Sequence, residues 1–158
     1  MKTKKGKIIV WVLFIIYILL LVKVILFKYP IAMVRAILKD IKVWSLSFRI
    51  SHSNFIPLKS IFQFILQNEN MRISLENILG NIMAFVPFGF LLPLLTDGAN
   101  KFKSIIISSF ILSLVFEIIQ LLTGLGEFDV DDVLLNVLGA SLGYILYRIF
   151  TSFTNKYL

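Results

Sequence analysis

Residues 8–27 read IIVWVLFIIYILLLVKVILF, an apolar stretch interrupted only by Lys23. A helix of about 20 apolar residues is long enough to cross the hydrocarbon core of a bilayer. Three further stretches have similar length and composition: residues 77–95, 104–123 and 133–150. Segments that cross lipid must be helical, since lipid offers the backbone no hydrogen-bond partner. The sequence therefore predicts an all-α membrane bundle of four transmembrane helices, in one domain that covers residues 1–158.

The composition supports a membrane protein and excludes several other classes. Of the 158 residues, 58% are hydrophobic and 16% are charged, whereas soluble domains are about half apolar and about a quarter charged. These values exclude a disordered tail, a collagen-like chain and an ordinary soluble domain. The absence of cysteine excludes disulfide bonds and thiolate metal sites. The net charge is +7, and because the basic residues lie between apolar runs, we expect membrane lipids rather than nucleic acid as partners.

The distribution of basic residues predicts the orientation in the cell membrane. Lysines at positions 2, 4, 5 and 7 precede the first apolar stretch, and no small-residue cleavage site follows it. This pattern favours an uncleaved signal anchor over a signal peptide. Lysines and arginines are divided almost evenly, eight on the side of the N-terminus and seven in the loop 28–76. Because the N-terminal cluster is dense and adjoins its helix, we expect both termini to be cytoplasmic.

The loop 28–76 contains helical patterns of its own. Basic residues share one face of a helical projection and apolar residues the opposite face: Arg35, Lys39, Lys42 and Arg49 against Val34, Ile37, Ile41, Trp44 and Phe48. The pattern predicts an amphipathic helix that either lies in the membrane interface or packs on the bundle. A second amphipathic piece is expected over residues 58–66, after Pro57. Within the second span, Pro87 and Pro93 predict a kink or an early end of that helix.

Polar residues inside the apolar stretches lie near those span ends that face the same leaflet, because successive spans alternate in direction. Such residues are costly in lipid and therefore indicate function. Together with a residue of the preceding loop they predict a polar pocket, formed by Asn54, Asn77, Asn81, Glu117, Gln120, Asp129, Asp132 and Asn136. With cytoplasmic termini, this pocket faces outward. Gly139 and Gly143 form a small-xxx-small pair that allows close approach of a neighbouring helix.

Several of these residues also have structural interpretations. Asn77 and Asn81 would serve as interhelical hydrogen-bond donors, and Asp129 would cap the fourth helix together with Asp131 and Asp132. Glu117 needs a partner, for which Lys23 is available unless it extends to the membrane surface. The set Glu117, Asp129, Asp132 and Asn136 would suit a hard divalent cation such as Mg²⁺, although the spacing favours no cofactor. The single histidine, His52, is more typical of an exposed loop than of a general base.

Three stretches of the sequence resemble the VanZ-like family of small membrane proteins, which is associated with teicoplanin resistance. They are NFIP at 54–57, NILGN at 77–81 leading to FVPFG at 85–89, and EIIQ at 117–120 followed by DVDDVLLNVLG at 129–139. Leu58 and Glu127 depart from the residues usual in that family. The resemblance implies an integral membrane protein of about four helices and a role in lowering susceptibility to glycopeptides.

Two functions from different classes are consistent with these features. In the first, the protein is an envelope protein that binds a lipid-linked cell-wall precursor head group or a lipoglycopeptide in the outer leaflet. In the second, it is a membrane enzyme that acts on such a head group, with Glu117 or Asp132 as the acid or base. A transporter is disfavoured because no inverted repeat is evident.

Overall fold

The computed structural model describes residues 4–39, 45–66, 71–96 and 101–157, and all of its regular elements are helices. In chain order they are α1 Lys4–Leu26, α2 Ile31–Lys39, α3 Leu46–His52, α4 Lys59–Leu66, α5 Met71–Leu95, α6 Phe102–Thr123 and α7 Val130–Tyr157. Four of them are long and apolar enough to cross a membrane, over Lys4–Leu26, Leu75–Leu95, Phe102–Thr123 and Val130–Thr154. The predicted fold class is therefore confirmed, with short helices between the first and second long ones.

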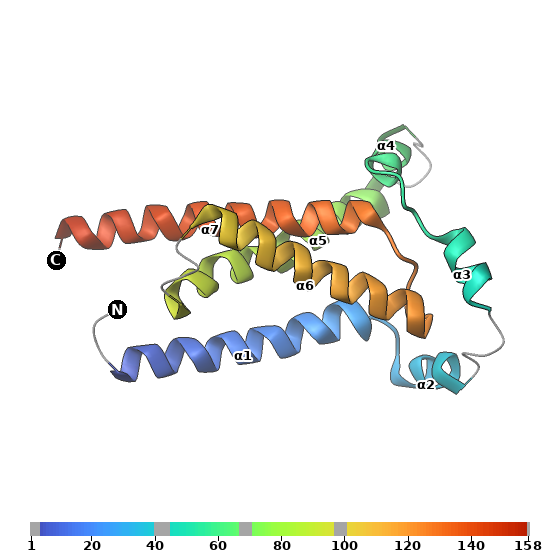
Figure 1. Cartoon of the computed structure of the whole chain (residues 1–158), viewed down its shortest axis with the longest axis horizontal. Coiled ribbons are helices and arrows are strands. Elements are labelled where there is room, and N and C mark those ends of the chain that lie inside the picture. The colour runs from blue at the N-terminus through green and yellow to red at the C-terminus, as the bar shows by residue number, and fades with distance from the viewer. Residues whose placement is uncertain (1–3, 40–44, 67–70, 97–100, 158) are drawn as a thin grey trace.

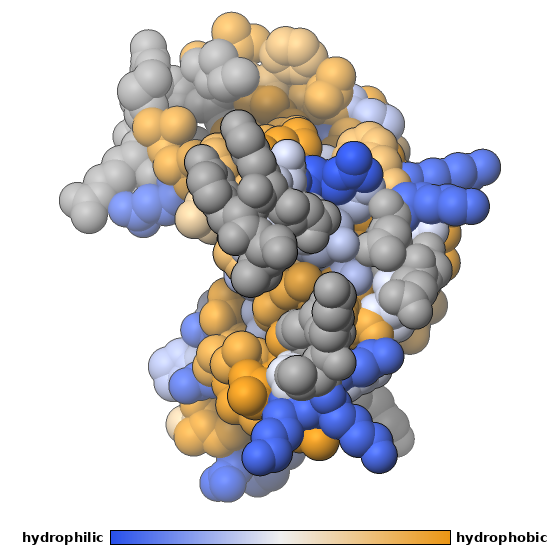
Figure 2. Space-filling view, turned by 90° about the vertical axis from the view of Figure 1, so that its left-hand side faces the viewer, coloured by the Kyte–Doolittle hydropathy of each residue, from blue (hydrophilic) through white to orange (hydrophobic). Residues whose placement is uncertain are grey.

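The long helices run alternately along the bundle, so that the described ends of the chain lie at one end of it (Figure 1). The short helices α2, α3 and α4 lie at the opposite end, where α1 and α6 finish and α5 and α7 begin. Seen from the end that carries the termini, hydrophilic atoms gather in groups around the rim, with hydrophobic atoms between them (Figure 2). Large apolar side chains on the long helices are exposed, among them Leu19, Met83 and Phe153. Such a surface suits lipid contact rather than water.

The closest helix pair in the bundle is α5 with α7, and glycines make the approach possible. A Cβ atom added to Gly139 would lie 2.0 Å from the carbonyl oxygen of Ile82, and one added to Gly143 would lie 2.0 Å from that of Val86. On the facing side, a Cβ on Gly89 would lie 1.8 Å from the carbonyl oxygen of Ala140. The two backbones are therefore in direct contact, as small residues allow in membrane helices.

Helix α1 packs on α5 through one hydrogen bond and aromatic contacts. The Tyr17 hydroxyl donates to the carbonyl oxygen of Ala84 at 2.8 Å. The rings of Phe14 and Phe88 lie 6.0 Å apart between centroids. Phe85, Ile105 and Ala140 are fully buried in the same apolar cluster.

Helix α5 is longer than the sequence predicted, and it does not end at its prolines. It begins at Met71 and continues through Pro87 and Pro93 to Leu95. A break inside the bilayer would expose several unpaired backbone groups, whereas an interior proline removes a single donor. Of the two outcomes predicted for the prolines, an early end is therefore excluded, and the kink stays a prediction.

The single amphipathic helix expected over residues 34–49 is also wrong, because two separate helices occupy this region. α2 ends at Lys39, and α3 starts after Ser45, whose extended backbone and side chain cap the new helix by accepting the N–H of Phe48 at 3.2 Å. Ser45 interrupts the helix because a capping residue satisfies the first amides from a non-helical conformation. Ile41, Lys42 and Trp44 lie outside the described residues. The second expected piece is confirmed as α4.

Candidate functional site

A cavity of about 980 Å³ opens at the end of the bundle that carries the short helices. Its wall comes from every long helix, from α2 and α3, and from the loop between α6 and α7. It includes seven of the eight residues predicted to form a polar pocket: Asn77, Asn81, Glu117, Gln120, Asp129, Asp132 and Asn136. Asn54 is not on the wall and lies behind it, bonded to Asp129. The expected convergence of three distant segments therefore occurs in the structure.

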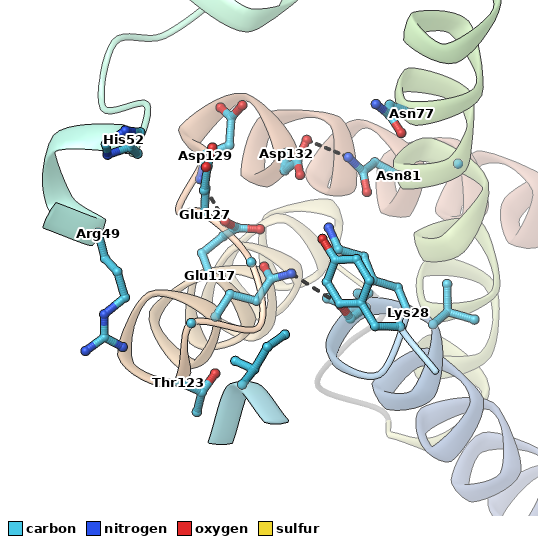
Figure 3. Close-up of a pocket in the computed structure, with 18 of the residues that line it drawn as sticks. Lys28, Arg49, His52, Asn77, Asn81, Glu117, Thr123, Glu127, Asp129 and Asp132 are labelled. Carbon is cyan, nitrogen blue, oxygen red and sulfur yellow. Dashed lines mark hydrogen bonds between the residues drawn. The ribbon is translucent and has the colours of Figure 1, made fainter. Parts of the chain in front are cut away.

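The two acid/base candidates, Glu117 and Asp132, face this cavity from α6 and α7 (Figure 3). The Glu117 side chain is only 3% exposed, and its Oε2 accepts the backbone N–H of Asp129 at 2.8 Å. Asp132 Oδ1 accepts from Asn81 Nδ2 at 2.6 Å. One oxygen of each carboxylate therefore helps to hold the walls of the cavity together.

The cation that faces these carboxylates is Lys28, which follows α1. It lines the same cavity as Glu117 and Asp132. The sequence had offered Lys23 as a partner for Glu117, but Lys23 lies more than one turn earlier, inside α1, and does not line the cavity. Lys28 follows the end of α1 at Leu26, and this later lysine lines the cavity.

Two buried amides form the inner wall. Gln120 Nε2 donates to the carbonyl oxygen of Ile25 on α1 at 3.2 Å. Asn136 Nδ2 donates to Ser113 Oγ at 2.8 Å, while Asn136 Oδ1 is buried and has no hydrogen-bond partner among the described residues. Buried polar atoms are nearly always paired, so this acceptor calls for a donor that the described protein does not supply.

Behind the cavity, the loop before α4 is bonded to the start of α7. Asn54 donates from Nδ2 to Asp129 Oδ1 at 2.8 Å, and Ser60 Oγ donates to Asp129 Oδ2 at 2.6 Å. Asp129 Oδ1 also accepts the N–H of Asp131 at 2.8 Å, which caps α7 as the sequence suggested. Asp129 thus combines the structural role with a place on the cavity wall.

Asp131, which is not among the predicted pocket residues, caps α4 from outside that helix. It is 1% exposed, and Oδ2 accepts the N–H groups of Ser60 at 2.8 Å and Ile61 at 3.2 Å, while Oδ1 accepts that of Leu58. Leu58 has a positive φ of 67° and no side-chain oxygen to cap the helix it precedes. A helix with leucine at its cap position needs a hydrogen-bond acceptor from another part of the chain. The leucine at this position was the sequence feature that indicated such an acceptor.

Arg49 and His52 line the cavity from α3, apart from the carboxylates (Figure 3). Arg49 Nη1 donates to the carbonyl oxygens of Leu121, at 3.0 Å, and Leu122, the last turn of α6. Arg49 therefore caps α6 instead of facing lipid head groups on a basic helix face. The His52 ring lies 4.0 Å from that of Phe48, and its Nδ1 is 2.9 Å from the Phe48 carbonyl oxygen. Its position is set by α3 itself.

Comparison with known sequences identifies the family. The VanZ/LLP1 family model matches residues 14–151, which is most of the chain. The protein belongs to the VanZ/LLP1 family. "Protein VanZ" of Enterococcus faecium is 27% identical over 122 residues, which cover 72% of this chain and 71% of that protein. No solved structure matches the chain.

Membership of the VanZ/LLP1 family agrees with a multi-pass membrane protein with four candidate spans. The matched range, 14–151, contains every residue that lines the cavity, so the cavity lies within the part that defines the family.

The acidic side chains on the wall do not form a cluster of three around one point among the described residues. Among the residues that the structure describes, no three histidine, aspartate or glutamate side chains are placed to hold a metal ion. Both Asp129 oxygens already accept hydrogen bonds from the protein.

Proposed function

We propose that this VanZ/LLP1 protein binds the polar head group of a membrane-anchored amphiphile, namely a lipid-linked cell-wall precursor or a lipoglycopeptide. The observation that carries the proposal is the cavity of about 980 Å³, whose polar wall is formed at the end of the membrane-spanning helices. An amphiphile whose tail lies in the bilayer presents its head group at that depth.

The lining of the cavity supports recognition of a polar group by several contacts. Asn77, Asn81 and Gln120 offer amides, and Glu117 and Asp132 offer carboxylates. Binding sites combine apolar surface with a few placed polar groups that fix orientation. Apolar side chains such as Val24, Ile25 and Met33 complete the wall and would contact the part of the ligand nearest its tail.

We further propose that the cavity faces outward and that binding there lowers susceptibility to teicoplanin. A protein that occupies or shields head groups in the outer leaflet reduces the access of a lipoglycopeptide to its target. The relationship to "Protein VanZ" supports this proposal, as do Lys4, Lys5 and Lys7 at the opposite end of the bundle.

A second candidate function is catalysis on the same head group. It is favoured by one observation: two carboxylates, Glu117 and Asp132, line one cavity, as a general acid and a general base require. Both carboxylates also hold the walls through hydrogen bonds to Asp129 and Asn81, which the binding function explains equally well.

Glu117→Gln separates the two candidates. The protein is expressed in a glycopeptide-susceptible host, and growth inhibition is measured with teicoplanin and with a glycopeptide that lacks an acyl chain. Under the binding function, protection is selective for teicoplanin and Glu117→Gln weakens it only in part, because the amide oxygen still accepts a hydrogen bond. Complete loss at normal abundance would favour catalysis. Lys103→Gln, at an exposed position outside the cavity, serves as the control.

A further inference from the structure

Among the buried side-chain atoms of residues that line the cavity, one donor, Arg49 Nε, and one acceptor, Asn136 Oδ1, have no hydrogen-bond partner among the described residues. Asn136 is only 2% exposed, lines the cavity, and has an Oδ1 atom with no partner among the described residues. Leaving such an acceptor unpaired is unfavourable in free energy. A ligand that donates a hydrogen bond at this position would recover that free energy.

The formal charge of the cavity wall also favours a cationic ligand. Five acidic side chains line the cavity: Glu76, Glu117, Glu127, Asp129 and Asp132. Two basic side chains, Lys28 and Arg49, also line it, and the Arg49 guanidinium already donates to backbone carbonyls at the end of α6. The wall is therefore net negative, which disfavours a phosphate in its inner part and favours a cation.

A bare metal ion does not satisfy this arrangement, since no three acidic or histidine side chains in the described ranges converge on one point. An ammonium group differs because its N–H donors point in several directions and reach acceptors about 2.8 Å away. An ammonium group can therefore be bound by acceptors that line a cavity without converging on one point.

We propose that the cavity takes up a primary ammonium group, with Glu117, Asp132 and Asn136 as its acceptors. The proposal rests on the head-group function above and names the chemistry of the group that is recognised. A zwitterionic phospholipid supplies such an ammonium beside a phosphate, and Lys28, which is exposed at the cavity, suits that phosphate. A free primary amine supplies the same ammonium without an anchor.

The test measures lipid retention by the full-chain protein in detergent, using native mass spectrometry. Three lipids with identical acyl chains are compared: phosphatidylethanolamine, phosphatidylglycerol and phosphatidylcholine. Phosphatidylethanolamine carries a primary ammonium, and phosphatidylglycerol carries uncharged hydroxyl donors. Phosphatidylcholine carries a quaternary ammonium without N–H donors. Phosphatidylethanolamine is expected to bind about tenfold more tightly than the other two, as one charge-assisted hydrogen bond allows. Glu117→Gln should remove most of this preference, while Lys103→Gln, at an exposed position outside the cavity, should leave it nearly unchanged.

Phosphoethanolamine, added as a soluble competitor, distinguishes the two sources of the amine. Displacement of the lipid shows that the ammonium is recognised without an anchor, and retention shows that the anchored lipid is the ligand; both agree with the proposal. Equal or tighter binding of phosphatidylglycerol would overturn the ammonium assignment and leave head-group binding intact. If wild type retains no lipid beyond the cavity-filling variant Gly80→Trp, head-group binding itself is wrong.

Discussion

Asn54 and Asp129, which are separated by 75 positions in the chain, pair through their backbones and their side chains. The N–H of Asn54 donates to the carbonyl oxygen of Phe128 at 2.7 Å, and the N–H of Val130 donates to the carbonyl oxygen of Asn54 at 3.0 Å. The Asn54 amide adds the contact to the Asp129 carboxylate at 2.8 Å. This pairing joins the loop before α4 to the start of α7 and so fixes the outer part of the cavity.

Asp131→Ala should destabilise this junction by about 2 kcal/mol or more, because it leaves the first amides of α4 without an acceptor. We expect faster proteolysis near α4 and a lower unfolding midpoint in detergent. Asp131→Asn, which keeps one acceptor oxygen, should have a smaller effect. Glu127→Ala, which removes an exposed acid from the same loop, should shift stability by less than about 0.5 kcal/mol. Equal effects of Asp131→Ala and Glu127→Ala would show that the capping contacts do not stabilise α4.

Gly139→Ala should destabilise the protein by about 1–3 kcal/mol or more, because its methyl group would meet the backbone of α5 at Ile82 and force the helices apart. The matched control is Gly80→Ala on α5, where an added Cβ meets nothing within 4 Å. That change should be neutral or stabilise by up to about 1 kcal/mol through helix propensity. Thermal unfolding in detergent compares the two variants. A stable Gly139→Ala variant would contradict the close α5–α7 contact.

Arg49→Ala should release α3 from α6, since the guanidinium holds two carbonyl groups at the end of α6. Loss of these charge-assisted bonds should cost about 1–3 kcal/mol and increase hydrogen exchange at the end of α6. Arg35→Ala, at an exposed position of α2, removes the same charge without these contacts and should leave exchange unchanged. If both variants behave alike, the role of Arg49 is only electrostatic.

Much of the fold could be predicted from sequence because lipid imposes a simple rule on composition. Four apolar stretches of sufficient length marked the four long helices. The family motif NFIP lies in the loop before α4, and the other motifs lie in the long helices or directly before them. The start of α5 was placed too late because Arg72 and Glu76 lower the hydropathy where the helix extends beyond the apolar part. The break between α2 and α3 was missed because helical periodicity continues across it, and only Ser45 marks the new start.

The site was predictable to the extent that helix direction determines it. Alternating spans bring their polar ends to one side, and this alone placed Asn81, Glu117 and Asp132 near each other. The contacts of Asp131 with the start of α4 were not predictable, since they join residues more than 70 positions apart. The place of Lys28 on the cavity wall was missed for a similar reason: it depends on where α1 ends.

The proposed orientation is tested by cysteine labelling, which the absence of native cysteine makes simple. Glu127→Cys, in the exposed loop between α6 and α7, should react with an impermeant thiol reagent in intact cells. Lys103→Cys, which is exposed at the opposite end, should react only after the cells are permeabilised. The reverse pattern would place the cavity on the cytoplasmic side.

Binding of a head group in the cavity can be measured through variants of Gly80. This residue lines the cavity on α5, and an added Cβ there meets nothing within 4 Å, so a large side chain can occupy the cavity without forcing helices apart. Lipid retention is measured for purified Gly80→Trp and Gly80→Ala in preparations that are folded to the same extent. We predict that Gly80→Ala retains phosphatidylethanolamine as wild type does and that Gly80→Trp loses about tenfold or more in affinity. Wild-type retention by a folded Gly80→Trp variant would contradict the account.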